Sequence, residues 1–458
     1  MSTVRQRIRF AFIANGIGRV MRVAEQLALV PLLLLGWGVE RYGEWIALYS
    51  IAVFAALAHP GIGVAAYSDI VIQFAGGNRR AAVRSFTTAI VLMVVTVAAG
   101  FGLLLVAINT LDIGHFVSHQ TITPAEARTI IAILGLAVLL QFGTEPLAGV
   151  LSAAVGAGLP NLVFGCTKAI EIAVIAGALY AGATPVFVAT ITLAAVLLHI
   201  AIDAVLAVRY APWLRMRWQD FDTSAIRRTW RPALGHFCLF VTFNIVNVHV
   251  PRLIVSYYLG AATLTIFTVF VTYTRASRNL AHMLSQAVQV EIGRAFAGGH
   301  AARGRALIEA MLGSALGIAI ALLALELVLA PLVIPAWTQG HVAVAWGLLA
   351  ALVLPTIAGA YFDATLQAAS ALNRVGFIAS CFTLGAAVGL AAGILLLPTL
   401  GLIAIAAITL LIPELAGSWA ATRTINAIVG HPHIRLTALS FWPAQVVTRD
   451  FANPPDPR

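Results

Sequence analysis

Long apolar stretches alternate with short polar connections along nearly the whole chain. Stretches such as 89–108 and 311–334 match the roughly 20 residues that a helix needs to cross a bilayer. Because a backbone in lipid must satisfy its own hydrogen bonds, each stretch is predicted to be helical. The pattern predicts about twelve spans, at 10–35, 45–72, 86–109, 128–154, 159–181, 185–208, 234–258, 262–289, 306–334, 343–369, 375–397 and 400–422.

Composition supports this interpretation and excludes a water-soluble domain. Of 458 residues, 60% are hydrophobic and 10% are charged, whereas soluble proteins carry about 25% charged residues. The predicted fold class is therefore all-α, a polytopic membrane protein. The net charge of +10 comes almost entirely from arginine, because Lys168 is the only lysine. Nucleic acid is not an expected partner, since that would need a soluble basic face.

The basic residues collect in every second connection, which predicts the orientation of the chain. Both termini are expected on the cytoplasmic side of the membrane. The residues that indicate this are Arg79, Arg80, Arg84, Lys168, Arg209, Arg215, Arg217, Arg227, Arg228, Arg231, Arg294, Arg303, Arg305 and Arg374.

Short sequence matches recur at a nearly constant spacing of about half the chain. Because the matching helices are separated by an even number of spans, both halves enter the membrane in the same direction. This predicts two parallel six-helix repeats around a central cavity, an arrangement typical of transporters. The matches are Leu35-Gly36 with Leu259-Gly260 (224 residues apart), Leu57-Ala58-His59 with Leu280-Ala281-His282 (223) and Phe74-Ala75-Gly76-Gly77 with Phe296-Ala297-Gly298-Gly299 (222).

The predicted domains follow from the repeat. Bundles at 1–208 and 234–424 are joined by 209–233 and followed by a cytoplasmic tail at 425–458. In 209–233, aromatic residues interleave with arginines, which favours an amphipathic helix on the anionic inner leaflet. An ordinary basic linker with aromatic anchors is the alternative.

Polar and cationic residues recur at helical spacing within several spans, where such residues are costly and usually face a cavity or a partner. They predict a cationic lumen that binds an anionic cargo, because the planar guanidinium suits phosphate or pyrophosphate. The alternative for each arginine is a snorkelling side chain or an internal ion pair. The predicted substrate-binding residues are Asn15, Arg19, Arg22 and Gln26 in the first span, Asn244, Asn247 and Arg252 in the seventh, and Arg275, Arg278, His282 and Gln286 in the eighth.

Other site types are predicted only weakly or not at all. Among the carboxylates in or near spans, Glu25 and Asp69 are the preferred candidates for binding a coupling ion. The sequence contains no P-loop, His-Glu-x-x-His or Gly-x-Ser-x-Gly motif, and its three cysteines are far apart. Catalytic residues, a cofactor and a metal site are therefore not expected.

One stretch near the N-terminus resembles a known family. It contains Leu35-Gly36, Arg41-Tyr42-Gly43-Glu44-Trp45, His59-Pro60-Gly61-Ile62-Gly63 and Ala75-Gly76-Gly77-Asn78. These residues resemble Wzx-type polysaccharide (O-antigen) flippases of the multidrug/oligosaccharidyl-lipid/polysaccharide exporter superfamily. His59 stands where that family often has an acidic residue.

The resemblance implies a cargo and a location. The cargo would be a polyprenyl-pyrophosphate-linked oligosaccharide, flipped from the inner to the outer leaflet of a bacterial cytoplasmic membrane. Membrane lipids and other polysaccharide-assembly proteins would be the partners. Two alternatives stay open: a cation-coupled multidrug exporter of the same superfamily, and a membrane enzyme such as a polymerase or sugar transferase.

Overall fold

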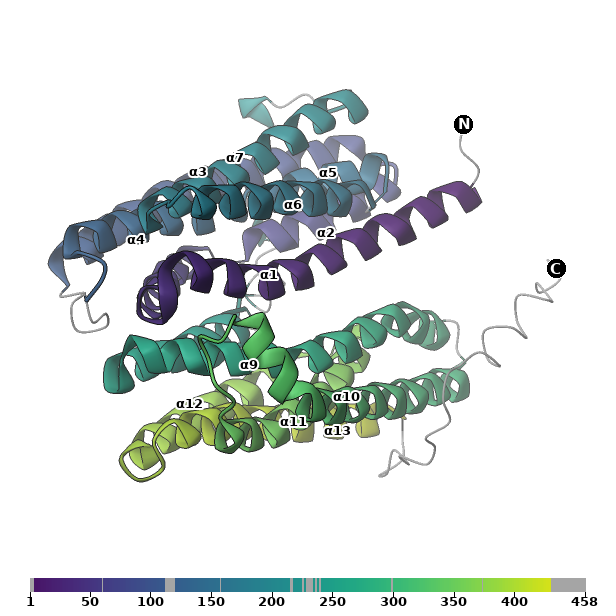
Figure 1. Cartoon of the computed structure of the whole chain (residues 1–458). Coiled ribbons are helices and arrows are strands. Elements are labelled where there is room, and N and C mark those ends of the chain that lie inside the picture. Colours follow the sequence, from purple (N-terminus) through teal and green to yellow (C-terminus); the bar gives the residue numbers. More distant parts are fainter. Residues whose placement is uncertain are drawn as a thin grey trace. The chain divides into compact units, whose positions relative to one another are not determined.

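The computed structural model contains only helices in its described residues (Figure 1). These residues are 4–59, 61–111, 120–156, 158–214, 217–224, 226–227, 234, 237–238, 240–297, 300–372 and 374–429. The helices are α1 (Val4–Val53), η1 (Phe54–Ala58), α2 (Ile62–Ala75), α3 (Arg79–Thr110), α4 (Pro124–Gln141), α5 (Thr144–Ala154), α6 (Gly158–Tyr180), α7 (Pro185–Tyr210), η3 (Trp218–Asp220), η4 (Val241–His249), α9 (Val250–Ala297), α10 (Ala301–Trp337), α11 (Trp346–Ala371), α12 (Gly376–Leu400), η5 (Ala404–Thr409) and α13 (Leu410–Val429).

The predicted all-α, polytopic fold class is confirmed. Among the described residues, nine helices are long and apolar enough to cross a membrane, or ten if the bent pair 27–58 and 62–74 forms one span. One of the nine, Val241–Gln286, has 46 residues and would be about 69 Å long if straight, roughly twice the hydrocarbon thickness. It bends at Gly260 and so contains two of the predicted spans.

The described chain divides into two compact units. Unit 1 contains 1–269 with 335–342, and unit 2 contains 270–334 with 343–458. The predicted division at 209–233 concerns the sequence repeat and stays a prediction. In the described part of that segment, the Asp222 backbone N–H donates to Thr88 Oγ1 of α3 at 2.9 Å. At the other predicted boundary, α13 continues to Val429, beyond the predicted helix end.

Two glycine turns locate the sequence repeat more accurately than the sequence matches do. Gly38 interrupts α1 with φ 76° and ψ 179°, and Gly260 interrupts α9 with φ 84° and ψ 171°. Only glycine adopts this backbone region readily. The two turns are 222 residues apart, the same spacing as the Phe-Ala-Gly-Gly match. The structural partner of Gly260 is therefore Gly38, and the predicted pairing with Gly36 is two residues out of register.

The helix segments that follow these turns contact each other within unit 1. Thr265 Oγ1 donates to the Val39 carbonyl at 2.6 Å, and Gly43 lies directly against the Ala261 carbonyl. Val39 and Gly43 are the repeat mates of Ala261 and Thr265, again 222 residues apart. Each contact is thus the counterpart of the other, as expected around a two-fold axis.

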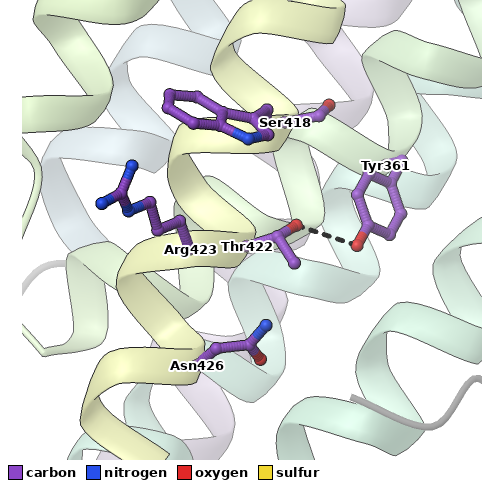
Figure 2. Close-up of a pocket in the computed structure, with 6 residues that line it drawn as sticks. Tyr361, Ser418, Thr422, Arg423 and Asn426 are labelled. Atoms are coloured by element: carbon purple, nitrogen blue, oxygen red, sulfur yellow. Dashed lines mark hydrogen bonds between the residues drawn. The ribbon is translucent and has the colours of Figure 1, made fainter. Parts of the chain in front are cut away.

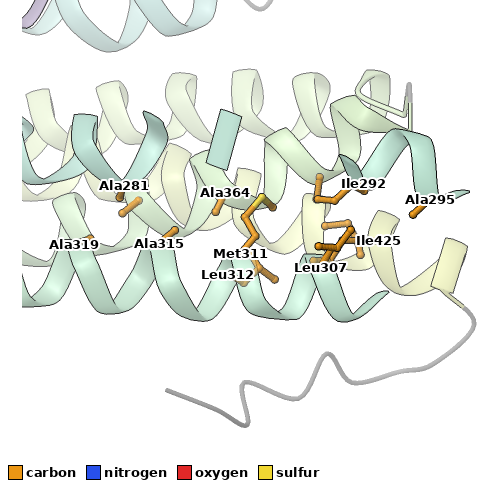
Figure 3. Close-up of a cluster of buried hydrophobic side chains, with 13 residues drawn as sticks. Ala281, Ile292, Ala295, Leu307, Met311, Leu312, Ala315, Ala319, Ala364 and Ile425 are labelled. Atoms are coloured by element: carbon orange, nitrogen blue, oxygen red, sulfur yellow. The ribbon is translucent and has the colours of Figure 1, made fainter. Parts of the chain in front are cut away.

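Small buried residues allow the helices of each unit to approach closely. In unit 1, α2, α3, α5 and α7 pack around residues such as Ala66, Ala82 and Ala207. In unit 2, a hydrogen bond at 3.0 Å between Tyr361 Oη and Thr422 Oγ1 joins α11 to α13 (Figure 2). The buried cluster of unit 2 is Ala281, Ile292, Ala295, Leu307, Ile308, Met311, Leu312, Ala315, Ala319, Ala360, Ala364, Ala368 and Ile425 (Figure 3).

A buried carboxylate holds the connection that leads into α4. Glu44 is fully buried and accepts hydrogen bonds from the backbone N–H groups of Gln120, Thr121 and Ile122, the shortest at 2.6 Å. The Thr121 hydroxyl donates to the same carboxylate at 2.7 Å. Glu44 is therefore a structural hydrogen-bond acceptor within helix segment 39–53, and its carboxylate charge is stabilised by the donors of residues 120–122.

We expect Glu44→Gln to lower the free energy of unfolding by about 2 kcal/mol, because hydrogen bonds to a charged acceptor contribute about 1.5–3 kcal/mol. The amide group would also present an N–H toward backbone donors. Thermal unfolding in detergent and protease cleavage near residue 120 measure the effect. The control is Glu40→Gln, an exposed carboxylate in the same helix. Equal stability of the two variants would contradict this role.

Candidate functional site

An intramembrane arginine lies beside two tyrosines in unit 1. Tyr42 and Tyr49 are seven residues apart, which places them on one face of helix segment 39–53. Both phenols interact electrostatically with Arg252 of α9. Arg252 is half-buried, and no carboxylate contacts its guanidinium within the described part of the chain.

Arg252 does not fit the geometry of a snorkelling side chain. It precedes the Gly260 turn by eight residues, or about 12 Å along a helix. Side chains on a helix point toward its N-terminus, so that of Arg252 leads away from the nearer helix end. Beside it, His249 Nδ1 lies 3.1 Å from Ser50 Oγ, and both residues are buried. We call Tyr42, Tyr49, Ser50, His249 and Arg252 the Arg252 cluster.

The only lysine of the chain forms a partly buried ion-pair group in unit 1. Lys168 lies inside α6, in agreement with the predicted span 159–181, although its charge was counted above with those of the connections. Its Nζ is 2.8 Å from Glu25 Oε1 and 2.8 Å from Glu171 Oε2. Two carboxylates around one ammonium leave a formal charge of −1. Both Lys168 and Glu25 interact electrostatically with Tyr49, which connects this group to the Arg252 cluster.

Unit 2 contains a second group of the same composition. Arg278 of α9 binds Asp363 of α11 through two hydrogen bonds, Nε to Oδ2 at 2.7 Å and Nη2 to Oδ1 at 2.9 Å. Its Nη1 donates to Glu414 Oε1 of α13 at 2.6 Å. Both carboxylate residues are buried. One guanidinium thus connects three helices, which favours the internal ion pair that the sequence left open for Arg278.

The other predicted site residues of the seventh and eighth spans take different positions. His282 lies next to the Arg278 group, with Nδ1 3.7 Å from Asp363 Oδ2, and Gln286 Nε2 is 2.8 Å from His282 Nε2. Arg275 interacts with Glu414. Asn247 is buried, whereas Asn244 is exposed and donates to the Phe240 carbonyl of its own helix at 3.3 Å.

The predicted residues of the first two spans are only partly described. The side chains of Asn15, Arg19, Arg22 and Gln26 lie outside the described residues, although their backbone belongs to α1. Asp69 accepts hydrogen bonds from Gln73 of α2 and Ser85 of α3. Glu25 and Asp69 therefore belong to separate hydrogen-bond groups, and ion coupling at either one stays a prediction.

Several members of the two unit 1 groups were missed by the sequence analysis. Tyr42 and Tyr49 carried a usable signal, because a spacing of seven puts two polar-tipped rings on one helix face. Ser50 and His249 carried no signal, since single polar residues in a span are common. Lys168 and Glu171 lie inside the predicted span 159–181, but no local pattern connects Lys168 to Glu25, which is 143 residues away.

Comparisons with known proteins identify the fold. No family model and no curated protein matches the sequence. An inward-facing multidrug resistance MATE family transporter of the MOP superfamily aligns with a TM-score of 0.68 at 15% identity, over 92% of this chain and 95% of the other. The lipid II flippase MurJ, in an inward closed conformation, gives 0.69 at 14% identity, over 92% and 87%. An outward-facing MATE family transporter gives 0.63 at 16% identity, over 94% and 96%.

These structures are transporters, and each similarity extends over nearly the full length of both chains. The agreement includes the helical, multi-pass architecture derived from the hydrophobic pattern. The chain has the fold of the MOP superfamily of membrane transporters.

Proposed function

We propose that this protein is a flippase that moves a polyprenyl-pyrophosphate-linked oligosaccharide from the inner to the outer leaflet of a bacterial cytoplasmic membrane by alternating access. The observation that carries the proposal is Arg252, an intramembrane guanidinium without a carboxylate contact in the described residues. A charge in that position is costly unless it has a partner. A pyrophosphate passing through the membrane would supply one, with bidentate hydrogen bonds.

The surroundings of Arg252 suit the rest of such a headgroup. The phenols of Tyr42 and Tyr49 and the hydroxyl of Ser50 can donate to or accept from sugar hydroxyls. Aromatic rings also provide apolar faces for sugar rings. Asn15, Arg19, Arg22 and Gln26 of the first span remain the further predicted cargo-binding residues. By contrast, Arg278 already binds carboxylates and contributes less to a cationic lumen than the sequence suggested.

We expect Arg252→Gln to reduce the flipping rate about 10- to 100-fold, because a hydrogen bond to a charged group contributes about 1.5–3 kcal/mol. The assay uses proteoliposomes with a fluorescent polyprenyl-pyrophosphate oligosaccharide, and measures the labelled lipid that an added quencher reaches over time. Arg252→Lys is the matched control, since it keeps the charge without the bidentate fork. It should retain intermediate activity.

The cellular test is the sidedness of lipid-linked oligosaccharide in a strain that lacks the protein. Finished, unpolymerised oligosaccharide should accumulate on the cytoplasmic face. Accumulation on the outer face would instead indicate a polymerase. An unchanged pool, together with a normal flipping rate for Arg252→Gln, would rule the proposal out.

A cation-coupled multidrug exporter is the second candidate. It is favoured by the Lys168 group, which has one more carboxylate than cation. An excess negative charge in a membrane interior can attract a proton or a metal cation. Efflux of a cationic dye from proteoliposomes, with and without proton or sodium gradients, separates the two candidates. Gradient-dependent dye efflux without oligosaccharide flipping would favour the exporter.

A further inference from the structure

The exposed side chains of α12 and α13 form the same series of residue types. The series runs with the chain direction on α13 and against it on α12. On α13, Leu415, Trp419 and Arg423 follow one another at intervals of four and therefore form one stripe. Leu415 and Trp419 are 53% and 55% exposed. On α12, Leu384 and Phe377 are exposed, and Arg374 lies two residues before the helix begins at Gly376. Each helix thus goes from leucine through an aromatic ring to arginine.

This order is the one expected across the boundary between hydrocarbon and water. Aromatic residues concentrate at the membrane interface, and arginine extends its charge to the polar side. The two series lie at the same level, because the rings of Phe377 and Trp419 are 5.9 Å apart. In the predicted orientation, this interface belongs to the cytoplasmic leaflet.

The surface between these residues contains two cavities, of about 450 and 530 Å³. Arg423 lines both of them. The first cavity also has polar groups from two helices, including the Tyr361–Thr422 hydrogen-bonded pair (Figure 2). The buried Ser418 Oγ, which lines it too, has no hydrogen-bond partner among the described residues. A simple aromatic anchor of a helix end needs neither a cavity nor such polar groups.

The positive charge of this surface favours an anionic ligand. Arg374 and Arg423 are exposed, and neither has a carboxylate contact in the described part of the chain. The Arg423 guanidinium lies 5.4 Å from the centroid of the Trp419 ring, so its position is partly fixed. In addition, α12 begins beside Arg374 and Phe377 of the second cavity, and its N-cap residue Val375 makes no side-chain hydrogen bond to the first turn. The N–H groups at the start of a helix favour phosphate.

We propose that these two cavities bind the headgroup of an anionic phospholipid. The phosphate would lie between Arg374 and Arg423, and the polar headgroup would contact Tyr361, Ser418 and Thr422. The acyl chains would run along the exposed apolar surface at Leu384 and Leu415. This continuity with the lipid-facing stripe argues for a membrane lipid and against a soluble phosphate compound. The inference does not depend on the transported cargo.

Native mass spectrometry of the full-length protein measures this site, after exchange into an equal mixture of phosphatidylglycerol and phosphatidylcholine. We expect wild-type protein to retain phosphatidylglycerol preferentially. Arg423→Gln should lower that preference about five-fold, and adding Arg374→Gln should lower it by a similar factor, since each arginine near an anionic lipid contributes about 1 kcal/mol. Arg209→Gln is the control, because Arg209 also lies near an aromatic ring, that of Tyr210, at 5.8 Å.

Three results would overturn the proposal. One is an unchanged lipid preference in the double variant. Another is an equal loss in Arg209→Gln, which would indicate general attraction to a basic surface. Displacement of phosphatidylglycerol by an equimolar polyprenyl pyrophosphate would also overturn it, and would assign the cavities to the cargo. Lipid retention is measured without transport. A failed flipping assay would therefore contradict the proposed function and would not contradict this lipid site.

Discussion

Replacing Arg278 with methionine is expected to lower the free energy of unfolding by about 3–5 kcal/mol, the cost of removing one partner of a buried ion pair. Asp363 and Glu414 would then face each other without the guanidinium that makes three hydrogen bonds with them. The loss should appear as a lower melting temperature in detergent and as less folded protein in membranes.

The informative control removes the whole charged group. A triple variant, Arg278→Met with Asp363→Asn and Glu414→Gln, should recover much of the lost stability, because a buried ion-pair group contributes little net stability compared with neutral residues. If the triple variant is no more stable than Arg278→Met, the unpaired carboxylates are not the cause of the stability loss in Arg278→Met. Wild-type stability in the single variant would show that the ion pairs do not form.

Gly43→Ala is expected to disrupt the contact between the two glycine turns. A Cβ atom on residue 43 would lie 2.0 Å from the Ala261 carbonyl oxygen and 2.6 Å from its carbon. Both are backbone atoms, so no side-chain rotation relieves the overlap and the two helix segments must separate. Overpacking typically costs about 1–3 kcal/mol and occasionally more, and we expect a loss at the upper end of that range.

The matched control is Gly102→Ala in α3, where a Cβ atom would meet nothing within 4 Å. That variant should keep its stability or gain up to about 1 kcal/mol, because alanine favours the helix. Thermal unfolding of both variants in the same detergent gives the comparison. A stable, active Gly43→Ala protein would mean that the turns do not pack as described.

The hydrophobic pattern was sufficient to predict the fold class because the bilayer leaves few alternatives. A stretch of apolar residues such as that in α3 can only be a helix there. The repeat was also visible, but its register was not. The matched dipeptides pointed to Gly36, whereas positive φ occurs at Gly38, and the sequence of Leu-Gly-Trp-Gly does not say which glycine turns.

The candidate site was less predictable, because a charged residue in a span has the same sequence signature whether it is paired or not. Arg252 and Arg278 lie before and after the Gly260 turn of α9, and both were predicted to bind the cargo. The two arginines differ in their partners, because Arg278 binds two carboxylates and Arg252 contacts none among the described residues. Asp363 and Glu414 are 85 and 136 residues away from Arg278, and nothing in the local pattern connects them to it.

The same separations have a consequence for the biogenesis of the protein. Asp363 and Glu414 are synthesised 85 and 136 residues after Arg278. At roughly 5–20 residues per second, the guanidinium therefore waits on the order of ten seconds for its partners. During that time, the second part of α9 carries a charge that lipid disfavours. This helix must then enter the lipid late, or stay in contact with the insertion machinery, until α11 and α13 emerge from the ribosome.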